Sequence, residues 1–388
     1  MSFSPLAGVR VVDVTTSYAG PTCTQLLGAL GADVVKVEPP AGDEARLWGP
    51  PFAAAGPGTL FVAANSGKRS VAIDLRRGTE VLGRLVDNAD VIVLSLRPGL
   101  AEELGLGAET LRERRPGLVH CTISSYGRAG PKALLPGYDP LLQAAGGLIS
   151  VTGEPGSAGV RVGVSLIDHT TGMYAAFAIL AALHEGGGRT LDVSLWETAL
   201  SYVSYHLIGN IETGAVPTPQ GTGFHAIAPY QVFPAADGGL MITAANDGLF
   251  RRLVDAIGLP ELAGDSRFAT NPDRVANRVE LVEALSARLR ERPRADWLEV
   301  LAAARVPAAP VQDVGEVAAD PQTEAMGILQ RLGPYTTLGP AFSADGERPR
   351  YASPPPALGE HTAAVLGEAG YSDGEIAALA EAGIIRLA

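Results

Sequence analysis

The stretch "VRVVDVTTSYAGPTCTQLLGALGADVVKVE", residues 9–38, decides the fold. Its first part, 9–14, is a valine-rich run typical of a buried strand. Pro21 and Gly31 bracket a helix, because proline is favoured at the first helical position and glycine just after the last. Residues 32–38 are a second valine-rich run. The stretch therefore predicts a strand, a crossover helix and a second, parallel strand.

The same alternation continues to about residue 125. We expect strands at 70–75, 90–96 and 118–125, and helices at 79–89 and near 100–114. Strands this rich in valine and isoleucine are typical of a parallel sheet with helices on both faces. The fold class is therefore α/β, with a Rossmann-like large domain.

A different pattern begins after about residue 225. Residues 230–245 predict a hairpin with an Ala-Asp-Gly-Gly turn, and amphipathic helices are expected at 247–258, 277–292 and 294–304. Prolines punctuate 305–321, which is typical of a linker. Two short helices are expected within the C-terminal segment, 359–385. A smaller α+β domain therefore follows the large one.

Composition excludes several classes of function. The formal net charge is −12, from 30 basic and 42 acidic residues, which disfavours nucleic-acid partners. The two cysteines, Cys23 and Cys121, lack metal-ligand spacing, so we expect neither a metal nor a disulfide framework. The first residues show neither the basic region nor the apolar region typical of a signal peptide, so we expect none, and the apolar run 173–183 is too short to span a bilayer. We expect a cytoplasmic protein without a membrane partner.

Asp168 is the main candidate for chemistry. It lies in "RVGVSLIDHTTGMYAAFAILAAL", residues 161–183, between a strand-like run and a long apolar helix. One interpretation is a helix N-cap. The other is a nucleophile, a poorly hydrated carboxylate held ionised at a helix N-terminus, with Gly172 allowing another surface to approach. His169 adjoins it, but neighbours in sequence point in different directions, so no catalytic dyad is implied.

Basic residues mark a possible phosphate site. Lys68 and Arg69 precede a predicted strand and Arg97 ends one, which are positions that suit phosphate groups. The alternative is that they are solvated loop charges. The first strand–helix turn lacks G-x-G-x-x-G, so Glu38 at the end of the second strand does not indicate a nicotinamide cofactor.

The segment "QGTGFHAIAPY", residues 220–230, has two interpretations. Gly221 and Gly223 could be the hinges of a lid. Equally, the segment could be an ordinary turn between domains. We expect a structural role for His225.

Ordered motifs along nearly the whole chain carry a family resemblance. The chain resembles the family III CoA-transferases, which include formyl-CoA transferase, carnitine CoA-transferase and the α-methylacyl-CoA racemases. Besides the opening stretch, the matching blocks are "NSGKRSVAIDL" (65–75), "RPG" (97–99), "YGRAGP" (126–131), "GYDPLLQAAGGLISVTG" (137–153), the D-x-x-x-G of 168–172 and "LGEHTAAVLGEAGYS" (358–372).

The resemblance implies an activity and a site. Asp168 matches the family's nucleophile, which forms an aspartyl mixed anhydride and then an aspartyl-CoA thioester. Acyl-CoA and a small carboxylic acid would be the substrates, with no permanently bound cofactor. The implied substrate-pocket residues are Tyr18, Tyr138, Gly221, Gly223 and Asp247. The implied CoA-binding residues are Lys68, Arg69, Arg97 and Arg46.

Two other activities stay open. Racemases of this superfamily use a histidine in a G-H-D block, where this chain has Gly137-Tyr138-Asp139. Tyrosine, with an ordinary pKa of about 10, is a poor base at neutral pH, which favours transfer over racemisation or intramolecular isomerisation. A catalytically silent CoA-binding protein is a third interpretation, and the intact Asp168 argues against it.

The resemblance also implies a domain division and a homodimer. Residues 1–225 would form the CoA-binding Rossmann-like domain, 226–324 the small domain, and 325–388 a segment returning to the large domain. Two subunits would interlock. The chain departs from the family at Ser66, where arginine is common, and at Pro39, where some members have a phosphate-binding arginine. Arg46 or Arg97 would then compensate.

Overall fold

A computed structural model describes residues 3–54 and 56–388 and divides the chain into two compact units. The first comprises 1–148, 162–211 and 322–388, and the second comprises 149–161 and 212–321. This division differs from the predicted boundary at 225 because residues 212–225 join the second unit. There, Gly221 N donates to Gly153 O at 2.7 Å, and Val232 N donates to Thr222 Oγ1 at 3.0 Å.

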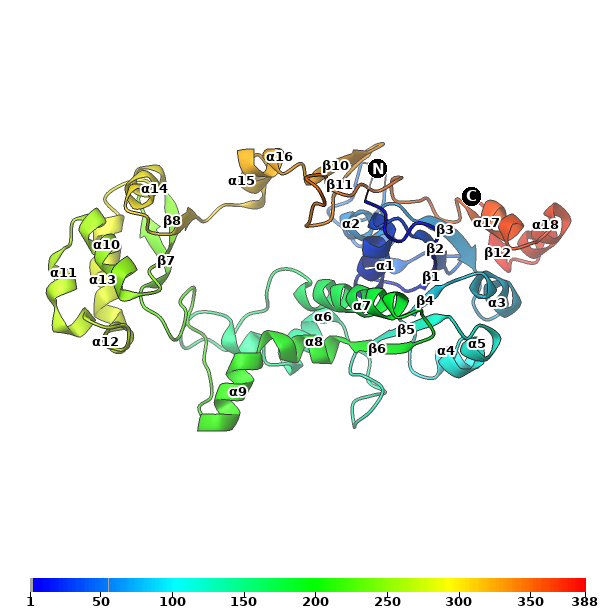
Figure 1. Ribbon diagram of the computed structural model, residues 1–388, viewed down its shortest axis with the longest axis horizontal. Coiled ribbons are helices and arrows are strands. Elements are labelled where there is room, and N and C mark those ends of the chain that lie inside the picture. The colour runs from blue at the N-terminus through cyan, green and yellow to red at the C-terminus, as the bar shows by residue number, and fades with distance from the viewer. Residues whose placement is uncertain (1–2, 55) are drawn as a thin grey trace. The chain divides into compact units, whose positions relative to one another are not determined.

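The first unit is built on a seven-stranded sheet of order β12-β3-β2-β1-β4-β5-β6 (Figure 1). β1 to β6 are parallel, and β12 pairs antiparallel with β3 at one edge. The order 3-2-1-4-5-6 is that of a doubly wound sheet, so the predicted α/β fold is confirmed. The strands are β1 Arg10–Val14, β2 Asp33–Glu38, β3 Arg69–Ile73, β4 Val91–Leu94, β5 Val119–Ser124, β6 Thr190–Ser194 and β12 Ile385–Arg386.

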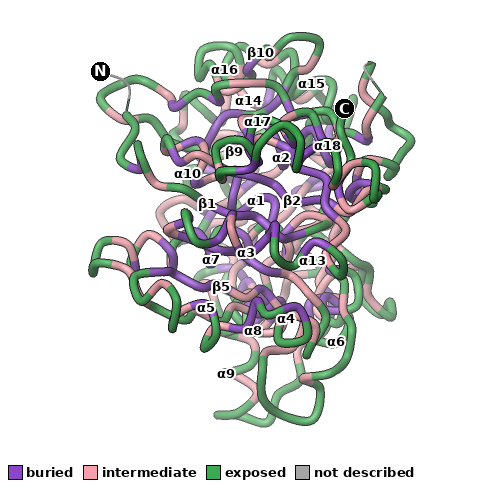
Figure 2. The backbone as a smooth tube through the Cα atoms, turned by 90° about the vertical axis from the view of Figure 1, so that its right-hand side faces the viewer, coloured by how far each residue is buried: buried purple, intermediate pink, exposed green. Residues whose placement is uncertain are grey.

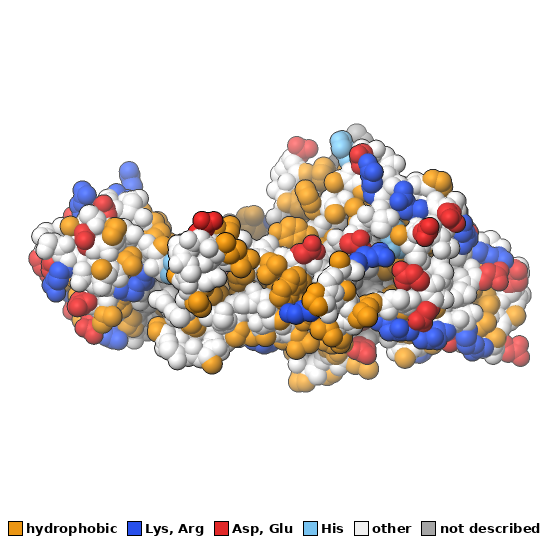
Figure 3. Space-filling model, turned by 90° about the horizontal axis from the view of Figure 1, so that it is seen from below, with side chains coloured by type: hydrophobic (Ala, Val, Ile, Leu, Met, Phe, Trp, Pro, Cys, Tyr) orange, Lys and Arg blue, Asp and Glu red, His pale blue; other side chains and the backbone are white. Residues whose placement is uncertain are grey.

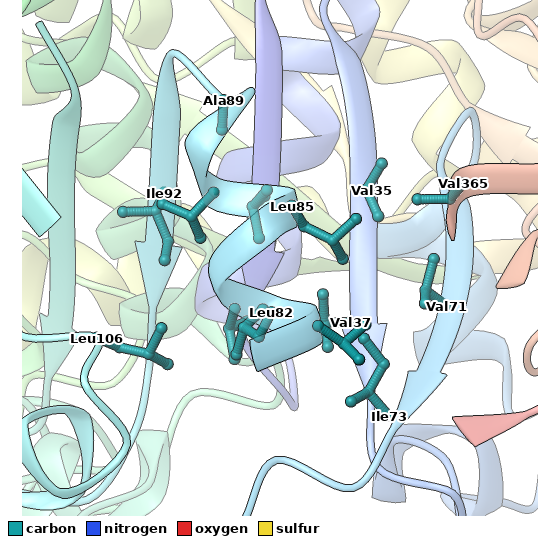
Figure 4. Packing of buried hydrophobic residues seen from close by; sticks show 14 of the residues in the cluster. Val35, Val37, Val71, Ile73, Leu82, Leu85, Ala89, Ile92, Leu106 and Val365 are labelled. Atoms are coloured by element: carbon teal, nitrogen blue, oxygen red, sulfur yellow. The ribbon is translucent and has the colours of Figure 1, made fainter. Parts of the chain in front are cut away.

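Helices cover both faces of this sheet. On one face, Leu82 and Leu85 of α3 point at Val35 and Val37 of β2 and at Ile92 of β4 (Figure 4). Burying each such side chain stabilises the fold by about 1.5–3 kcal/mol. The helices on this face are α3 Thr79–Asp87, α5 Ala108–Arg114, α17 Thr362–Glu368 and α18 Asp373–Glu381.

The second face is covered by helices from three separate stretches of the chain. They are α1 Ala19–Ala29, α6 Asp139–Ala145, α7 Leu166–His184 and α8 Leu195–Tyr202. The strands between the two layers are buried, as the purple trace along β1 and β2 shows (Figure 2). The predicted helix near 100–114 is instead two helices, α4 Leu100–Glu103 and α5. Gly105, whose φ is +70°, interrupts it.

α1 and α7 pack unusually closely at Gly172. A Cβ atom at this position would lie 2.5 Å from the carbonyl oxygen of Ala19, so only glycine fits. Residues 162–165, which were predicted as strand-like, form no strand and lead directly into α7. By length and composition, α7 is the one helix in the described part of the chain that could cross a membrane. One such helix is weak evidence, and α7 packs on α1, β5 and β6.

Several shorter elements lie in the first unit or at its borders with the second. They are the 3-10 helices Glu44–Leu47 and Ile149–Val151, α2 Thr59–Asn65, α9 Ser204–Thr213, α16 Pro321–Ala325, and the hairpin of β10 Leu329–Leu332 and β11 Tyr335–Leu338. Of these, Ile149–Val151 and the end of α9 belong to the second unit, and α16 begins at its last residue.

The second unit has a three-stranded antiparallel sheet and its own core. The predicted hairpin is confirmed as β7 and β8, and Phe233 and Leu240 bury their side chains against Trp297 and other core residues. The predicted linker is not wholly irregular, because Ala308–Pro310 forms β9 and pairs with β8. The elements are β7 Tyr230–Ala235, β8 Gly238–Thr243, β9, α10 Asp247–Ile257, α11 Glu261–Gly264, the 3-10 helix Ser266–Phe268, α12 Asn271–Ala276, α13 Arg278–Leu289, α14 Arg294–Ala303 and α15 Val314–Ala318.

Candidate active site

A cavity of about 450 Å³ lies at the carboxyl ends of β1, β4 and β5 in the first unit. This is the edge of a doubly wound sheet at which ligands bind, and the strand order reverses between β1 and β4. Loops after three strands and the start of α7 supply the lining. Its polar and charged side chains are Thr16, Ser17, Ser95, Arg97, Ser124, Ser125, Tyr138 and Asp168.

The loop after β1 is held in a strained conformation at the cavity. Ser17 has φ of +68°, in the left-handed region that side chains other than glycine seldom adopt. Its N–H donates to Asp43 Oδ1 at 3.2 Å, and the N–H of Thr16 donates to Ser95 Oγ at 3.1 Å. These bonds stabilise a conformation that by itself costs roughly 1–3 kcal/mol.

A buried ion network lies beneath this loop. Lys36 Nζ is 2.8 Å from Asp43 Oδ2, and Lys68 Nζ is 3.0 Å from Asp13 Oδ2, with all four side chains fully buried. Burial by itself would raise the pKa of Asp13, but the charges of Lys68 and Lys36 and two threonine hydroxyls lower it to about 2. The network therefore holds the loop from below, with the Asp13 carboxylate ionised.

Asp168 lies in the first turn of α7 and lines the cavity, half-buried. Burial, and then the charge of Asp139, raise the pKa of Asp168 to about 7. Asp168 is not the N-cap, since Ser165 holds that position. Among the described residues, none donates a hydrogen bond to the Asp168 carboxylate or forms an ion pair with it. This carboxylate is therefore available to a ligand.

Asp139 on α6 performs the capping instead. Its fully buried Oδ2 accepts from the N–H groups of Ile167 at 2.7 Å and Asp168 at 3.1 Å. Gln143, one turn later, donates to Asp139 and accepts from the N–H of Val162 at 2.8 Å. This pair was not predicted from the sequence. The available signal was an acid at the first position of a helix with an amide four residues later.

The structure brings Arg97 and Tyr138 to the same cavity as Asp168. Arg97 is the only lysine or arginine among the described lining residues, and its exposed side chain pairs with Glu103 at 3.0 Å. A surface pair of this kind is worth at most about 1 kcal/mol, so a phosphate or carboxylate ligand can displace Glu103. Tyr138 is 54% exposed at the cavity mouth.

Tyr18 lies beside the cavity, between the lining residues Ser17 and Ala19. Its hydroxyl is 3.4 Å from Nδ1 of His169, a histidine for which the sequence indicated no partner. Burial, and then the charge of Asp168, raise the pKa of Tyr18 above its ordinary value. The phenol is therefore a neutral hydrogen-bond donor close to the candidate nucleophile.

The sequence matches CoA-transferase family III over residues 6–362. The chain belongs to this family. It is 38% identical over 382 residues to the succinate–glutarate CoA-transferase of Agrobacterium fabrum, covering 94% of this chain and 95% of the relative. It is 35% identical over 398 residues to the human succinyl-CoA:glutarate CoA-transferase, covering 99% and 90% of the two chains.

The structural comparison agrees with this assignment. The crystal structure of a CaiB/BaiF family protein from Brucella suis superposes with a TM-score of 0.86 at 38% identity, covering 94% of this chain and 99% of that one. The predicted family and mixed α/β fold are confirmed, and so is the predicted activity class. The chain is a CoA-transferase, and acyl-CoA is its class of substrate.

Three of the basic residues predicted to hold CoA do not face the cavity of this CoA-transferase. Lys68 is enclosed beneath the first loop, where it bonds Asp13, Pro21 O and Asn65. Arg69 begins β3 at the opposite edge of the sheet and pairs with Asp33 at 2.6 Å and Glu368 at 2.8 Å. Lys68 is enclosed and Arg69 is paired with two carboxylates, and their role in binding CoA stays a prediction.

Arg46 is also occupied. Its guanidinium makes two 2.7 Å bonds to Glu38, donates to the carbonyl of Pro356 and stacks 3.9 Å above the ring of Phe61. Only 14% of its side chain is exposed. Of the four predicted CoA contacts, Arg97 alone lines the cavity with Asp168.

The remaining predicted pocket residues belong to the second unit of the CoA-transferase. Gly221 has φ of +60° and lines a separate cavity there, with Glu154 and Thr222. Gly223 follows Thr222 in the chain. Asp247 forms an ion pair with the buried Arg274 at 2.7 Å. No group of three potential metal ligands occurs within residues 3–54 and 56–388.

Proposed function

We propose that this CoA-transferase moves CoA between two dicarboxylic acids through covalent intermediates on Asp168. The observation that carries the proposal is the Asp168 carboxylate itself. It lines the cavity at the strand ends, and no described residue donates to it or pairs with it. A carboxylate that is poorly solvated and free of protein partners is a competent nucleophile.

In the first half-reaction, an Asp168 oxygen attacks the carbonyl carbon of the donor thioester. The carbon–sulfur bond breaks, and CoA leaves as a thiolate, which gives a mixed anhydride. The thiolate then attacks the aspartyl carbonyl of that anhydride. The first acid leaves as a carboxylate, and Asp168 becomes a CoA thioester.

The second half-reaction runs the same steps in reverse. The acceptor carboxylate attacks the aspartyl thioester and expels CoA thiolate, which then attacks the acceptor carbonyl of the new anhydride. Asp168 is regenerated, and no proton or electron is gained or lost overall. The energy of the thioester is kept throughout, so no permanently bound cofactor is required.

Acids of the succinate and glutarate type are the proposed exchange partners. The relatives from Agrobacterium fabrum and human are named for succinate or succinyl-CoA and glutarate. A dicarboxylate presents a second negative charge that needs donors. The cavity offers serine hydroxyls at 95, 124 and 125 together with Arg97. Arg97 is also the proposed contact for the anionic part of CoA, since the net charge of −12 gives no long-range attraction.

We also propose that the enzyme acts as a homodimer. Large apolar side chains stand exposed on α7 and α9 of the first unit, and orange areas mark hydrophobic side chains on the face seen in Figure 3. Phe177 of α7 is 72% exposed, and Ile211 of α9 is 71% exposed. Exposed apolar surface of this kind is typical of subunit interfaces.

Exchange between isotopically distinct acids tests the function. Purified enzyme is incubated with succinyl-CoA and carbon-13 glutarate, and labelled glutaryl-CoA is measured by mass spectrometry. Hydroxylamine attacks the aspartyl carbonyl of either intermediate and releases the acid or CoA, so peptide mapping should find a hydroxamate adduct at Asp168. Asp168→Asn should abolish exchange and the adduct without lowering the melting temperature, because an amide is a poor nucleophile.

A matched substitution serves as control. Asp296→Asn changes an exposed aspartate in the first turn of α14 and should leave exchange unchanged. Exchange at the wild-type rate by homogeneous Asp168→Asn enzyme, with deamidation excluded, would overturn the nucleophile assignment. Exchange only between monocarboxylic acids would overturn the substrate class and leave the mechanism standing.

A further inference from the structure

Close packing of two helices brings Tyr18 to the start of α7. Gly172 of α7 lies against the carbonyl of Ala19 at the start of α1. Tyr18 directly precedes α1, and His169 lies in the first turn of α7. The glycine contact therefore sets Tyr18 next to His169, although 151 residues separate them.

The two side chains make one polar and one ring contact. Tyr18 Oη lies 3.4 Å from His169 Nδ1, and the rings lie 6.0 Å apart between centroids, tilted by 32°. A separation of 3.4 Å is long for a hydrogen bond. Catalytic hydrogen bonds in ligand-free enzymes are often long and tighten when substrate binds.

Asp168 directly precedes His169 in the first turn of α7, and burial and then its charge raise the pKa of Tyr18. Its backbone N–H is bonded to Asp139, but its carboxylate accepts no hydrogen bond from any residue in 3–54 or 56–388. Desolvation and the charge of Asp139 both disfavour the ionised carboxylate that attacks a thioester. A neutral donor can offset both effects without itself forming an ion pair that blocks attack.

We infer that Tyr18 and His169 form a positioning pair for the nucleophile, in which His169 Nδ1–H donates to Tyr18 Oη and Tyr18 donates its own hydrogen to the Asp168 carboxylate. The inference rests on the proposed nucleophilic role of Asp168. Tyr18 keeps its proton throughout, so the pair takes part in no covalent step. Its role is to hold one carboxylate oxygen and direct the other toward the thioester carbonyl.

The direction of the two bonds depends on which ring nitrogen of His169 carries the hydrogen. Burial lowers the pKa of His169, so its imidazole is neutral at pH 7 and carries one N–H. With the hydrogen on Nδ1, the phenol oxygen accepts and its hydrogen remains for Asp168. With Nδ1 bare, the phenol would donate to the imidazole instead, and Asp168 would gain nothing.

Substitution of Tyr18 gives the first test. Tyr18→Phe should lower kcat about tenfold or more, as expected for losing a hydrogen bond to a charged group, with KM for acyl-CoA changed less than about twofold. The acidic limb of the pH–rate profile should move up by about one pH unit, because the carboxylate loses a donor. Tyr174→Phe, on the exposed side of α7, is the matched control and should change neither quantity.

The pH shift is specific because, within residues 3–54 and 56–388, few titratable groups share the cavity of Asp168 or act on its pKa. They are Asp139 on α6 and Arg97 after β4, with the phenols of Tyr18 and Tyr138 and the imidazole of His169 beside them. Tyr18→Phe alters none of the others. An unmoved acidic limb together with an unchanged kcat would overturn the inference.

Substitution of His169 tests the direction. His169→Leu removes the donor and should slow kcat, whereas His169→Asn places an amide N–H near the former Nδ1 and should restore most of the rate. In the Tyr18→Phe background, His169→Leu should cost nothing more, since the two act through one contact. Additive losses, or a faster His169→Leu enzyme, would overturn the pair.

The exchange assay separates this inference from the proposed function. If wild-type enzyme exchanges CoA and forms the Asp168 adduct but Tyr18→Phe behaves like wild type, only the positioning pair is wrong. If wild type forms no adduct on Asp168, the proposed mechanism has failed first. Thermal unfolding of each variant shows that lost rate does not come from lost fold.

Discussion

Oδ2 of Asp139 accepts a hydrogen bond from the backbone N–H of Asp168 at 3.1 Å. The capping of α7 and its chemistry are thus assigned to different residues. Asp139 accepts hydrogen bonds from the N–H groups at the start of the helix. The Asp168 side chain is therefore not needed to cap the helix, and it lines the cavity. The same proximity places two carboxylates together, and the charge of Asp139 disfavours ionisation of Asp168.

The pH dependence of the rate follows from Asp168. Its pKa is raised to about 7, and only the ionised carboxylate is nucleophilic, so kcat/KM should rise with pH and level off above about pH 8. The measurement is the initial rate of exchange from about pH 5 to about pH 9, where thioesters survive the assay. A profile already flat at pH 5 would mean that Asp168 has an ordinary carboxyl pKa.

Removing the charge of Asp139 should move this profile in a defined direction. Asp139→Asn keeps one acceptor oxygen but removes a like charge beside Asp168, so the pKa of Asp168 should fall. The acidic limb should then move to lower pH, opposite to the shift expected for Tyr18→Phe. The same variant should melt earlier, because its new amide N–H faces the donating amide of Gln143.

A control for Asp139→Asn is an equal change elsewhere on the same unit. Asp192→Asn alters a surface aspartate on β6 whose partner is Arg128 at 3.4 Å. Asp192→Asn should leave both the acidic limb of the pH–rate profile and the melting temperature nearly unchanged. An acidic limb that moves upward in Asp139→Asn would contradict the proposed like-charge effect.

The alternation of strands and helices was predictable because each element has its own local signal. Valine runs marked β1 to β5, and Pro21 and Gly31 marked the ends of the first helix, which the structure places at 19–29. β6 was missed because "TLDVS" has three polar residues in five. β12 has two residues and exists only because β3 offers an open edge.

The site was predictable only where a residue acts through its position on a strand end or helix start. Asp168 and Arg97 met that condition and lie in one cavity. Lys68 and Arg69 are adjacent in sequence, yet one is sealed against Asp13 and the other pairs across the sheet edge with Glu368. No local pattern carries such long-range partners, so sequence could not separate a phosphate ligand from a structural charge.

Substitutions of Arg97 and Lys68 should separate those two roles. Arg97→Ala should weaken CoA binding about tenfold, measured by calorimetry, because it removes the one cationic side chain of the described cavity lining. Its melting temperature should stay within error, since Arg97 is exposed and its bond to Glu103 is a surface pair.

Lys68→Met should have the opposite effect. It leaves the fully buried Asp13 without its partner, which should cost about 3–5 kcal/mol of stability and lower the melting temperature. Where the variant still folds, its CoA affinity should be close to wild type. A stable Lys68→Met enzyme with selectively weakened CoA binding would instead support the predicted contact between Lys68 and CoA.

Racemisation is the activity that Tyr138 argues against, and hydrogen exchange at the α-carbon tests it. A two-base racemase needs a second group able to take a proton at neutral pH. Tyr138 lines the cavity and is 54% exposed, and a tyrosine side chain is a poor base at neutral pH. A chiral 2-methylacyl-CoA incubated with the enzyme in heavy water should therefore keep its α-hydrogen while CoA transfer to an added acid proceeds. Mass spectrometry follows both reactions in one tube.

Tyr138→His is the informative variant, because an imidazole there supplies the missing base and should introduce measurable deuterium incorporation. Deuteration by the wild-type enzyme as fast as transfer would show that a base other than Tyr138 serves the α-carbon and that racemisation is a native activity of this site.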